Sequence, residues 1–561
     1  MSGRAGTGAE RLVEALSLAG AEVVFGLPGV HNLTAWNALA ASGIGLVCVR
    51  HEQAAVYAAD GYARATGGLG VALLTTGPGA ANALAATGEA WASRSPVLVI
   101  ATDVPAALRR QGVHRGLLHE CVDQPAMFGP VVKSSLAAGR AGDVGPAAVR
   151  ASALALAAPR RPVYLQVPTD LLDAESPPAG GPPAPPPARV PDEAAAGFAA
   201  ELLAGARRPL VWAGGGAVAA DAGAALAALA ERLAAPVVTT FAGRGLLAPD
   251  HPLDAGLPPH VPECGALWDE ADVVVAVGSD LDGTSTQNWA MPRPERLIAV
   301  NVDRGDASKA WPPDAVVCAD ARAGVADLLD RLGPPDDAGG HAARAGRVAA
   351  RLAGARAAAR ERLAREQPAE IAFLDAFAAA VPAEATVVAD MCIPGYWLAG
   401  FRRPAGPRRM LYPMGWGTLG FAFPAALGAA RALRDGAIGG PVVSVSGDGG
   451  FLFACGELAT AAQDRLPLTA VVVDDGGYGM LRYDQGRRGA SGSSMDLATP
   501  DFAALARSFG VRAEAVDGLG DAFGAALAAH VADPAPSVLV ARAALDPPPT
   551  TSPRWYRLGR E

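Results

Sequence analysis

Short apolar segments rich in valine, leucine and isoleucine recur along the whole chain and alternate with longer alanine-rich segments. Apolar strands of this length, separated by stretches of helical size, are typical of parallel sheets that helices cover on both faces. The pattern therefore predicts an α/β fold of doubly wound parallel sheets. The apolar segments lie at residues 45–49, 70–76, 95–102, 161–167, 209–216, 235–240, 272–279, 296–302, 386–390, 441–449, 468–475 and 537–543.

Proline- and glycine-rich stretches divide these segments into three groups. The chain has 561 residues, which at the usual ~100–200 residues per domain calls for several domains. We therefore expect three doubly wound domains, a proline-rich linker, a second linker with an arginine- and alanine-rich helix, and a proline-rich tail. These segments are the domains 1–174, 195–333 and 369–547, the linkers 175–194 and 334–368, the helix from 348 to about 366, and the tail 548–561.

Composition and charge narrow the class of protein. The net charge is −9 and the arginines are scattered along the chain, which argues against nucleic acid as the main partner. No segment approaches the ~20 uncharged apolar residues of a membrane span. The six cysteines are far apart and form no CxxC motif, so neither a zinc site nor a disulfide framework is indicated. These features predict a cytoplasmic protein that acts on a small molecule.

Acidic residues follow two neighbouring apolar segments of the last domain. Asp448 and Asp475 are 27 positions apart, with one helix-sized segment between them. Ligands of parallel sheets bind at the carboxyl ends of the strands, so both carboxylates are expected at one edge. Two such carboxylates require a cation between them, and oxygen ligands suit Mg²⁺ or Ca²⁺. The alternative is that each Asp-Gly pair is an ordinary turn.

The Gly447-Asp448-Gly449 motif, followed after about 27 residues by a polar doublet, resembles the metal and diphosphate motif of thiamine diphosphate enzymes. The segments 25–32, 49–67 and 75–82 are similar to the pyrimidine-binding domain of the acetolactate synthase and 2-oxo acid decarboxylase family, which includes benzoylformate decarboxylase. The resemblance implies that the first domain binds the pyrimidine and the third the diphosphate. The central domain would then be the six-stranded spacer of this family.

The resemblance implies a catalytic role for Glu52. In the family, this glutamate hydrogen bonds to N1′ of the aminopyrimidine and promotes proton removal from the thiazolium carbon. The chemistry requires a carboxyl group in a dry pocket, where it can hold and share a proton. A glutamate that opens a helix is also explained by the helix dipole, which is the alternative interpretation.

Further site residues are implied by matching motifs. Asp475 departs from the family, which commonly has asparagine there. Leu419 takes the position of the apolar residue that supports the bent cofactor, although simple core packing would explain it equally. The implied cofactor-binding residues are Gly29, Pro78, Asn82, Gly417, Leu419, Gly447, Asp448, Gly449, Gly450, Asp475, Tyr478, Gly479 and Met480, and the implied metal ligands are Asp448, Asp475 and the carbonyl of Gly477.

Two histidines are candidates for the substrate side. His119 stands where acetolactate synthases carry glutamine, and residues 389–397 lack the Gln-His-Gln run of those enzymes. His31 and His119 could donate protons or bind a carboxylate. Each could equally be a structural histidine.

The resemblance implies an enzyme that uses thiamine diphosphate and Mg²⁺ to decarboxylate a 2-oxo acid. The expected outcome is carboligation to a second carbonyl, as in acetolactate synthase; the alternatives are simple decarboxylation, a flavin-dependent oxidase and a non-catalytic homologue. The glycine-rich segment 212–221 is a weak dinucleotide motif, so FAD stays open. A homodimer or homotetramer is expected, with sites shared between subunits and with the helices after Glu52 and Gly420 as candidate interface elements.

Overall fold

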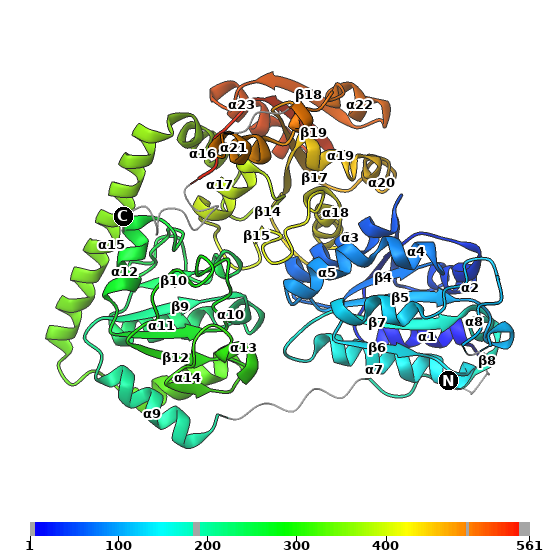
Figure 1. Ribbon diagram of the computed structural model, residues 1–561, viewed down its shortest axis with the longest axis horizontal. Helices are drawn as coiled ribbons and strands as arrows, with labels where there is room; N and C mark the ends of the chain where they lie inside the picture. Colours follow the sequence, from blue (N-terminus) through cyan, green and yellow to red (C-terminus); the bar gives the residue numbers. More distant parts are fainter. Residues whose placement is uncertain (1–5, 111, 183–190, 490–492, 549–561) are drawn as a thin grey trace.

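The computed structural model describes residues 6–110, 112–182, 191–489 and 493–548. Three parallel sheets form three lobes, with the third sheet beside both of the others (Figure 1). The α/β fold expected from the sequence is confirmed. Most of the predicted tail, and residues 183–190 of the first linker, lie outside the described residues. Within the described ranges, no helix is long and apolar enough to span a bilayer.

The first sheet has six parallel strands in the order β3-β2-β4-β5-β7-β6. In β2, Val23 and Phe25 belong to one apolar core and Val24 to another, so helices cover both faces. Its strands are β2 (Val23–Gly26), β3 (Gly45–Cys48), β4 (Gly70–Leu74), β5 (Val97–Asp103), β6 (Ser134–Ala137) and β7 (Val163–Pro168), and its helices include α1 (Gly8–Leu18), α2 (Leu33–Ala40), α3 (Glu52–Thr66), α4 (Pro78–Asn82), α5 (Leu84–Ala92), α6 (Gln124–Phe128), α7 (Val144–Leu156) and α8 (Thr169–Asp173).

A small antiparallel pair, which the sequence pattern did not predict, lies beside the first sheet. Strand β1 (Gly6–Thr7) pairs with β8 (Glu175–Ser176) and so connects the start of the described chain to the end of the first domain.

The third sheet also has six parallel strands, in the order β15-β14-β16-β17-β19-β18. In β17, Val471 and Val473 face one core, while Ala470 and Val472 face the other. Its elements are α16 (Pro368–Ala380), β14 (Thr386–Ala389), α17 (Ile393–Phe401), β15 (Met410–Leu411), α18 (Ala422–Arg434), β16 (Val442–Gly447), α19 (Asp448–Leu452), α20 (Leu458–Gln463), β17 (Leu468–Asp474), α21 (Gly479–Arg487), α22 (Phe502–Ser508), β18 (Arg512–Asp517), α23 (Asp521–Val531) and β19 (Ser537–Arg542).

The central sheet has five parallel strands in the described residues, in the order β10-β9-β11-β12-β13, and not the six that the resemblance implied. Beyond β13 the chain passes through one helix, α14, and then enters α15. Its elements are α9 (Glu193–Ala204), β9 (Pro209–Ala213), α10 (Gly215–Ala219), α11 (Gly223–Leu233), β10 (Val237–Thr239), α12 (Pro262–Glu270), β11 (Val273–Val277), β12 (Arg296–Val300), α13 (Arg304–Ser308), β13 (Ala315–Val317) and α14 (Ala321–Leu332).

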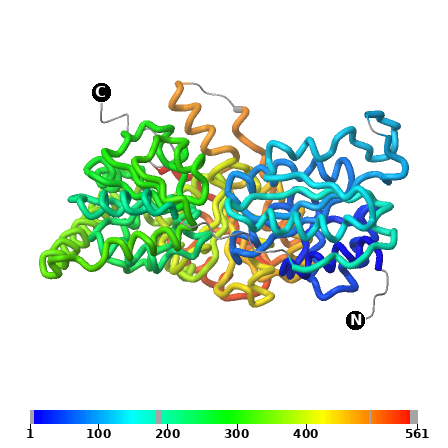
Figure 2. The backbone as a smooth tube through the Cα atoms, turned by 90° about the horizontal axis from the view of Figure 1, so that it is seen from below, coloured from blue at the N-terminus to red at the C-terminus, as the bar shows by residue number. Residues whose placement is uncertain are grey.

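The long helix α15 (Ala338–Glu366) connects the central domain to the third domain along the outside of the molecule (Figures 1 and 2). It begins ten residues before the predicted start at 348. The reason is its N-cap, because the Asp337 side chain accepts a hydrogen bond from the N–H of Gly340. The glycines near this end suggested a linker, but the cap and the following alanines extend the helix.

Helices α3 and α18 pack directly against each other within one chain. A Cβ atom added to Gly61 would lie 2.0 Å from the carbonyl oxygen of Ala425, and one added to Gly428 would lie 1.9 Å from that of Ala58. The two glycines therefore allow the backbones to touch. The sequence analysis named these helices as candidates for a subunit interface, but their facing surfaces are already covered by each other.

Candidate active site

Two acidic loops meet at the carboxyl edge of the third sheet. Strands β16 and β17 are parallel neighbours; Asp448 follows the first and Asp475 lies one residue beyond the second. The buried Asp448 side chain accepts a hydrogen bond from the N–H of Gly449 at 2.7 Å and another from the N–H of Gly477 at 2.7 Å. The structure thus brings Asp448 together with the loop at 475–477.

Burial disfavours the charged form of both carboxyl groups. It raises the pKa of Asp448 to about 7, and the nearby charge of Asp475 adds to the shift. Burial also raises the pKa of Asp475, whereas Arg482 opposes that shift across an ion pair of 2.8 Å between Nη2 and Oδ1. Arg482, in α21, was missed by the sequence analysis because an arginine in a polar helix gives no distinguishing signal.

The donor set fits a magnesium ion shared with a diphosphate. No group of three or more histidine, cysteine, aspartate or glutamate side chains in the described ranges could hold a metal. The two carboxylates, with a backbone carbonyl of the 475–477 loop, would leave positions for phosphate oxygens and water, which Mg²⁺ usually retains. A divalent cation would also relieve the repulsion between Asp448 and Asp475.

Glycines allow the backbone to approach closely at this edge. A Cβ atom at Gly449 would come 2.7 Å from Cε1 of Tyr478, and one at Gly479 would come 2.0 Å from Oδ2 of Asp475. A side chain at Gly449 would displace the ring of Tyr478, and one at Gly479 would displace the carboxylate of Asp475. Gly447 ends β16, Gly450 is buried in α19, and Met480 is the second residue of α21.

Asp390 holds the segment that precedes α18 and was missed by the sequence analysis. It follows β14 and is fully buried. Its carboxylate accepts hydrogen bonds from the N–H groups of Gly420 at 2.9 Å, Phe421 at 3.3 Å and Met391 at 3.1 Å. Burial raises the pKa of Asp390 to about 7, against these three donors. Its sequence signal was its place after a third apolar strand.

The segment that Asp390 holds presents apolar side chains to the outside of the chain. Gly417 has a φ of +73°, and Leu419 is 38 % exposed. Trp416 and Phe453 are 51 % and 56 % exposed. Leu419 is therefore not a packed core residue in the single chain, which removes the simple packing explanation for it.

Glu52 lies at the start of α3 in a nearly closed environment. It is 7 % exposed, and its Oε2 accepts a hydrogen bond from Nδ2 of Asn82 at 3.0 Å. A Cβ atom at Gly79 would lie 3.1 Å from Oε1, so the backbone of α4 covers the carboxylate. The structure thus brings Glu52 and Asn82 together, with Pro78 as the first residue of α4.

His31 and His119 form a pair. Their ring centroids are 5.5 Å apart with an edge-to-face geometry. Burial lowers the pKa of His31, the charge of His119 lowers it further, and Asp103 opposes the shift. His31 therefore favours its neutral form, and its Nδ1 atom is buried with no hydrogen-bond partner among the described residues. Asp103, which ion-pairs with Arg109 at 2.6 Å, was missed by the sequence analysis.

Helix α4 and the turn before it connect the histidine pair with Glu52. A Cβ atom at Gly77 would lie 2.5 Å from the carbonyl oxygen of His119, while Asn82 at the other end of α4 contacts Glu52. Gly29 lies beside the preceding strand end, since a Cβ atom there would come 2.6 Å from Oγ1 of Thr75. The predicted residues of the first domain therefore gather around one edge of its sheet.

Glu52 and Asp448 have separate hydrogen-bond environments in the chain. In the described residues, the side chain of Glu52 bonds to Asn82, and that of Asp448 bonds to Gly449 and Gly477. One link between the two halves is the N–H of Arg50, which donates to Oε1 of Glu457 at 2.9 Å.

The glycine-rich turn after β9 is explained by backbone packing. A Cβ atom at Gly214 would lie 2.5 Å from the carbonyl oxygen of Gly278, and one at Gly216 would lie 2.8 Å from its Cα atom. The loop after β11 contacts the first domain, where Asp280 pairs with Arg94 at 2.8 Å. The close approaches of Gly214 and Gly216 to Gly278 account for these two glycines by backbone packing alone.

Comparisons with known proteins match each part of this arrangement. Three family models match in order: "Thiamine pyrophosphate enzyme, N-terminal TPP binding domain" at residues 6–127, the "central domain" at 197–328 and the "C-terminal TPP binding domain" at 391–541. The solved structure of the thiamine diphosphate-dependent 4-hydroxybenzoylformate decarboxylase of Rhodococcus jostii is similar, with a TM-score of 0.80, 25% identity, and coverage of 96% of this chain and all of that chain.

Relatives include decarboxylases and acetolactate synthases. A Pseudomonas aeruginosa protein named "Probable 2-ketoarginine decarboxylase" is 40% identical, with 90% of this chain and 88% of that protein covered. An Escherichia coli acetolactate synthase isozyme 3 large subunit is 31% identical, with 90% of this chain and 88% of that protein covered. The chain therefore belongs to the thiamine pyrophosphate enzyme family, as an enzyme with thiamine diphosphate-binding domains.

Proposed function

We propose that the protein catalyses the non-oxidative decarboxylation of a 2-oxo acid with thiamine diphosphate and Mg²⁺. The observation that carries this proposal is the imidazole pair of His31 and His119, next to the turn before α4, the helix whose last residue, Asn82, hydrogen bonds to Glu52. Simple decarboxylation needs a proton donor at the carbon that has lost CO₂, and imidazoles are suited to that task near neutral pH. The similarity to decarboxylases supports the same outcome.

Asp448, Asp475 and the carbonyl of Gly477 would hold the magnesium ion and, through it, the diphosphate. The N–H groups near Gly449 and Gly450, at the start of α19, would approach the phosphate oxygens. When bound, thiamine diphosphate would supply a thiazolium ring that takes up the electron pair left when CO₂ departs from the substrate. Leu419 would support the cofactor from below, in a segment that Asp390 keeps in position.

Glu52 would hold the proton that the aminopyrimidine needs. Its closed surroundings exclude water, and Asn82 fixes one carboxylate oxygen and leaves the other free. His31 in its neutral form can accept a proton at Nδ1, the atom without a partner, while His119 is exposed and can exchange protons with solvent. The pair could therefore deliver a proton from water to the reacting carbon.

Carboligation is the second candidate. It is supported by the similarity to acetolactate synthases over about nine tenths of the chain. The distinction depends on whether a proton or a second carbonyl compound reaches the reacting carbon first. The position of His119, where those synthases carry glutamine, favours the proton.

We further propose a cytoplasmic homodimer or homotetramer in which Glu52 of one subunit and Asp448 of another act on one cofactor. This assembly is supported by the separate surroundings of the two groups. It is also supported by the exposed apolar side chains of Trp416, Leu419 and Phe453.

The experiment is a substrate panel. Purified protein with thiamine diphosphate and Mg²⁺ is incubated with aliphatic, aromatic and guanidino 2-oxo acids, including 2-ketoarginine, with and without an aldehyde or keto acceptor. Products are identified by mass spectrometry. An aldehyde one carbon shorter than the substrate supports decarboxylation, a hydroxyketone supports carboligation, and the absence of any product from every acid contradicts both.

A further inference from the structure

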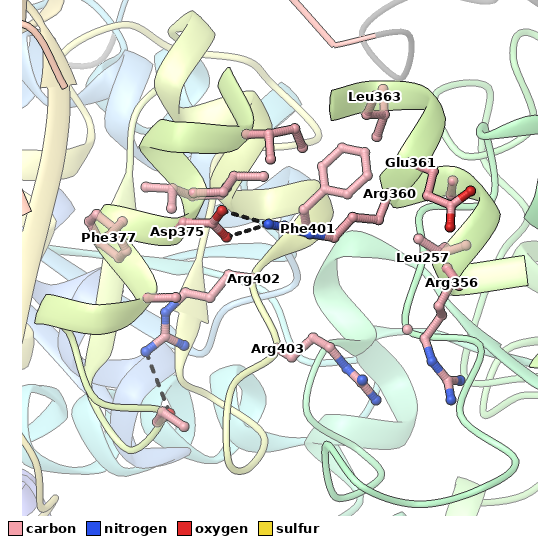
Figure 3. Close-up of a pocket in the computed structure, with 18 of the residues that line it drawn as sticks. Leu257, Arg356, Arg360, Glu361, Leu363, Asp375, Phe377, Phe401, Arg402 and Arg403 are labelled. Carbon is pink, nitrogen blue, oxygen red and sulfur yellow. Dashed lines mark hydrogen bonds and ion pairs between the residues drawn. The ribbon is translucent and has the colours of Figure 1, made fainter. Parts of the chain in front are cut away.

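A cavity of about 700 Å³ lies between α15 and the third domain, lined by α15, α16, the end of α17 and a loop of the central domain (Figure 3). Small-molecule sites in proteins typically have volumes of about 300–1,000 Å³. None of the residues proposed to bind the cofactor lines this cavity. It is therefore a separate space that the proposed function leaves unused.

The cavity combines apolar walls with a cluster of arginines. Leu363, Phe377 and Phe401 are among the apolar side chains on its walls. The charged residues that line it are Arg356, Arg360, Glu361, Asp375, Arg402 and Arg403. Four cations against two anions give the lining a positive surplus.

The acidic residues do not neutralise the cluster. Asp375 forms an ion pair with Arg360, in which Nη2 of the arginine lies 2.7 Å from Oδ1 (Figure 3). Glu361 is exposed. Arg402 donates from Nη2 to the carbonyl oxygens of Pro382 at 2.8 Å and Ala385 at 3.1 Å, and so has backbone partners in place of a carboxylate.

One residue beside the cavity, Asp254, accepts hydrogen bonds from two of the arginines, one through its carboxylate and one through its backbone carbonyl. Arg403 donates from Nη2 to Oδ2 of Asp254 at 3.0 Å, and Arg356 donates from Nη1 to the carbonyl oxygen of that same residue at 2.7 Å. Within the described residues, Nη1 of Arg402 and Nε of Arg403 are buried without hydrogen-bond partners. Unsatisfied donors on buried cations are costly, so the protein does not compensate this positive charge fully.

Burial is the main cause of a lowered pKa in two of these arginines, and neighbouring cations add to it. Burial lowers the pKa of Arg402 to about 10, and the nearby charge of Arg409 lowers it further against Glu384. Burial likewise lowers the pKa of Arg356, with a further contribution from Arg403 that Asp254 opposes.

We propose that this cavity binds an amphipathic organic anion, with its charged group at Arg356 and Arg403 and its apolar body against α16 and α17. The arrangement supplies charge-assisted hydrogen bonds at one end and apolar surface at the other.

The last described residues of the chain pass close to the cavity, so the C-terminal segment is the competing occupant. Asp546 donates from its N–H to Oε1 of Glu370 at 2.7 Å, and Trp397 donates from Nε1 to the carbonyl oxygen of Asp546 at 2.8 Å. Residues 549–561 contain Arg554, Arg557 and Arg560 against one glutamate. This mainly basic segment is a poor partner for an arginine cluster, which favours an external anion.

The test measures binding of three eight-carbon probes to the full-length protein loaded with thiamine diphosphate and Mg²⁺. Calorimetry with octanoate, 1-octanol and octylammonium separates the contributions of charge and apolar surface. We expect octanoate to bind at least roughly tenfold more tightly than the other two. Equal affinity for octanoate and 1-octanol would overturn the assignment of an anion site.

Variants locate the probe. Arg356→Met should weaken octanoate binding roughly tenfold, Arg356→Lys should weaken it less, and Arg347→Met, an exposed position on the same helix, should leave it unchanged. Ala378→Trp, at an exposed position on the cavity wall, should abolish binding by filling the space. Circular dichroism checks that each variant folds. If Arg356→Met does not fold, Ala378→Trp still tests the proposal.

Two further outcomes would overturn the proposal. Octanoate affinity in folded Ala378→Trp equal to that of the wild type would place the probe elsewhere. Octanoate binding that appears only after removal of residues 549–561 would assign the cavity to the C-terminal segment.

Discussion

Nδ2 of Asn82 donates a hydrogen bond to Oε2 of Glu52 at 3.0 Å, which ties the end of α4 to the start of α3. We expect Asn82→Ala to lower kcat roughly tenfold, because the hydrogen bond that orients the carboxyl group of Glu52 is lost. The thermal midpoint should change little, since Asn82 is itself largely exposed. Steady-state kinetics tests this, with exposed Asn37→Ala as the control. Unchanged kcat in Asn82→Ala would show that the bond does not position Glu52.

Asp448 and Asp475 should differ in their contributions to cofactor binding. Asp448→Ala removes a buried ligand and should abolish Mg²⁺-dependent retention of thiamine diphosphate. Asp475→Asn should have a much milder effect, because the amide oxygen can still coordinate the metal, although Arg482 loses its ion pair. Calorimetry at several Mg²⁺ concentrations measures both effects. Unchanged magnesium dependence in both variants would show that the metal site is elsewhere.

The buried carboxyl group of Asp390 should make stability depend on pH. Its folded pKa of about 7 lies above the ordinary value of 3.8, so the unfolded chain binds fewer protons between these limits. The contribution of this group to the free energy of unfolding is fully present below about pH 4. It decreases by up to about 1.4 kcal/mol per pH unit above that and is lost above about pH 7. Thermal unfolding of wild type and Asp390→Asn across this range should show a difference that changes with pH. A constant difference would mean that Asp390 does not titrate in this range.

The assembly can be tested by mixing inactive subunits. Glu52→Gln and Asp448→Ala should each be inactive, whereas a mixed dimer with shared sites has one site without a lesion. Random exchange should restore roughly a quarter of the wild-type activity. Subunit exchange is verified by mass spectrometry of differently tagged chains. Exchange without recovery would mean that each chain builds its own site.

Most of the strands that sequence analysis missed differ in physical character from those that it found, although the buried interior strand β2 was missed as well. The buried strands β16 and β17 are long apolar runs, and their position was clear. The edge strand β18 (Arg512–Asp517) alternates polar and apolar residues and is partly exposed, and β15 has two residues. Such short or polar edge strands depend on their neighbours for pairing, so their own sequences carry little signal.

The candidate site was predictable where chemistry requires a particular residue at a particular strand end. Glu52, Asp448 and the loop at 475–477 follow strands and carry that pattern. Asp390 and Asp103 also stand at strand ends, but their importance comes from the N–H groups of Gly420 and Phe421 and from Arg109, which the strand pattern does not specify. The packing of α3 on α18 was likewise hidden, since apolar faces do not specify their partners.

The most direct test of the account is the rate of CO₂ release by Glu52→Gln with saturating thiamine diphosphate and Mg²⁺. The substrate is the 2-oxo acid that the wild type decarboxylates fastest, and cofactor binding is measured in parallel by calorimetry. The account predicts nearly unchanged folding and cofactor affinity, with turnover lowered by ~10²–10⁴, as expected for loss of a general acid–base partner. Turnover close to that of the wild type would contradict the proposal that Glu52 serves the bound cofactor.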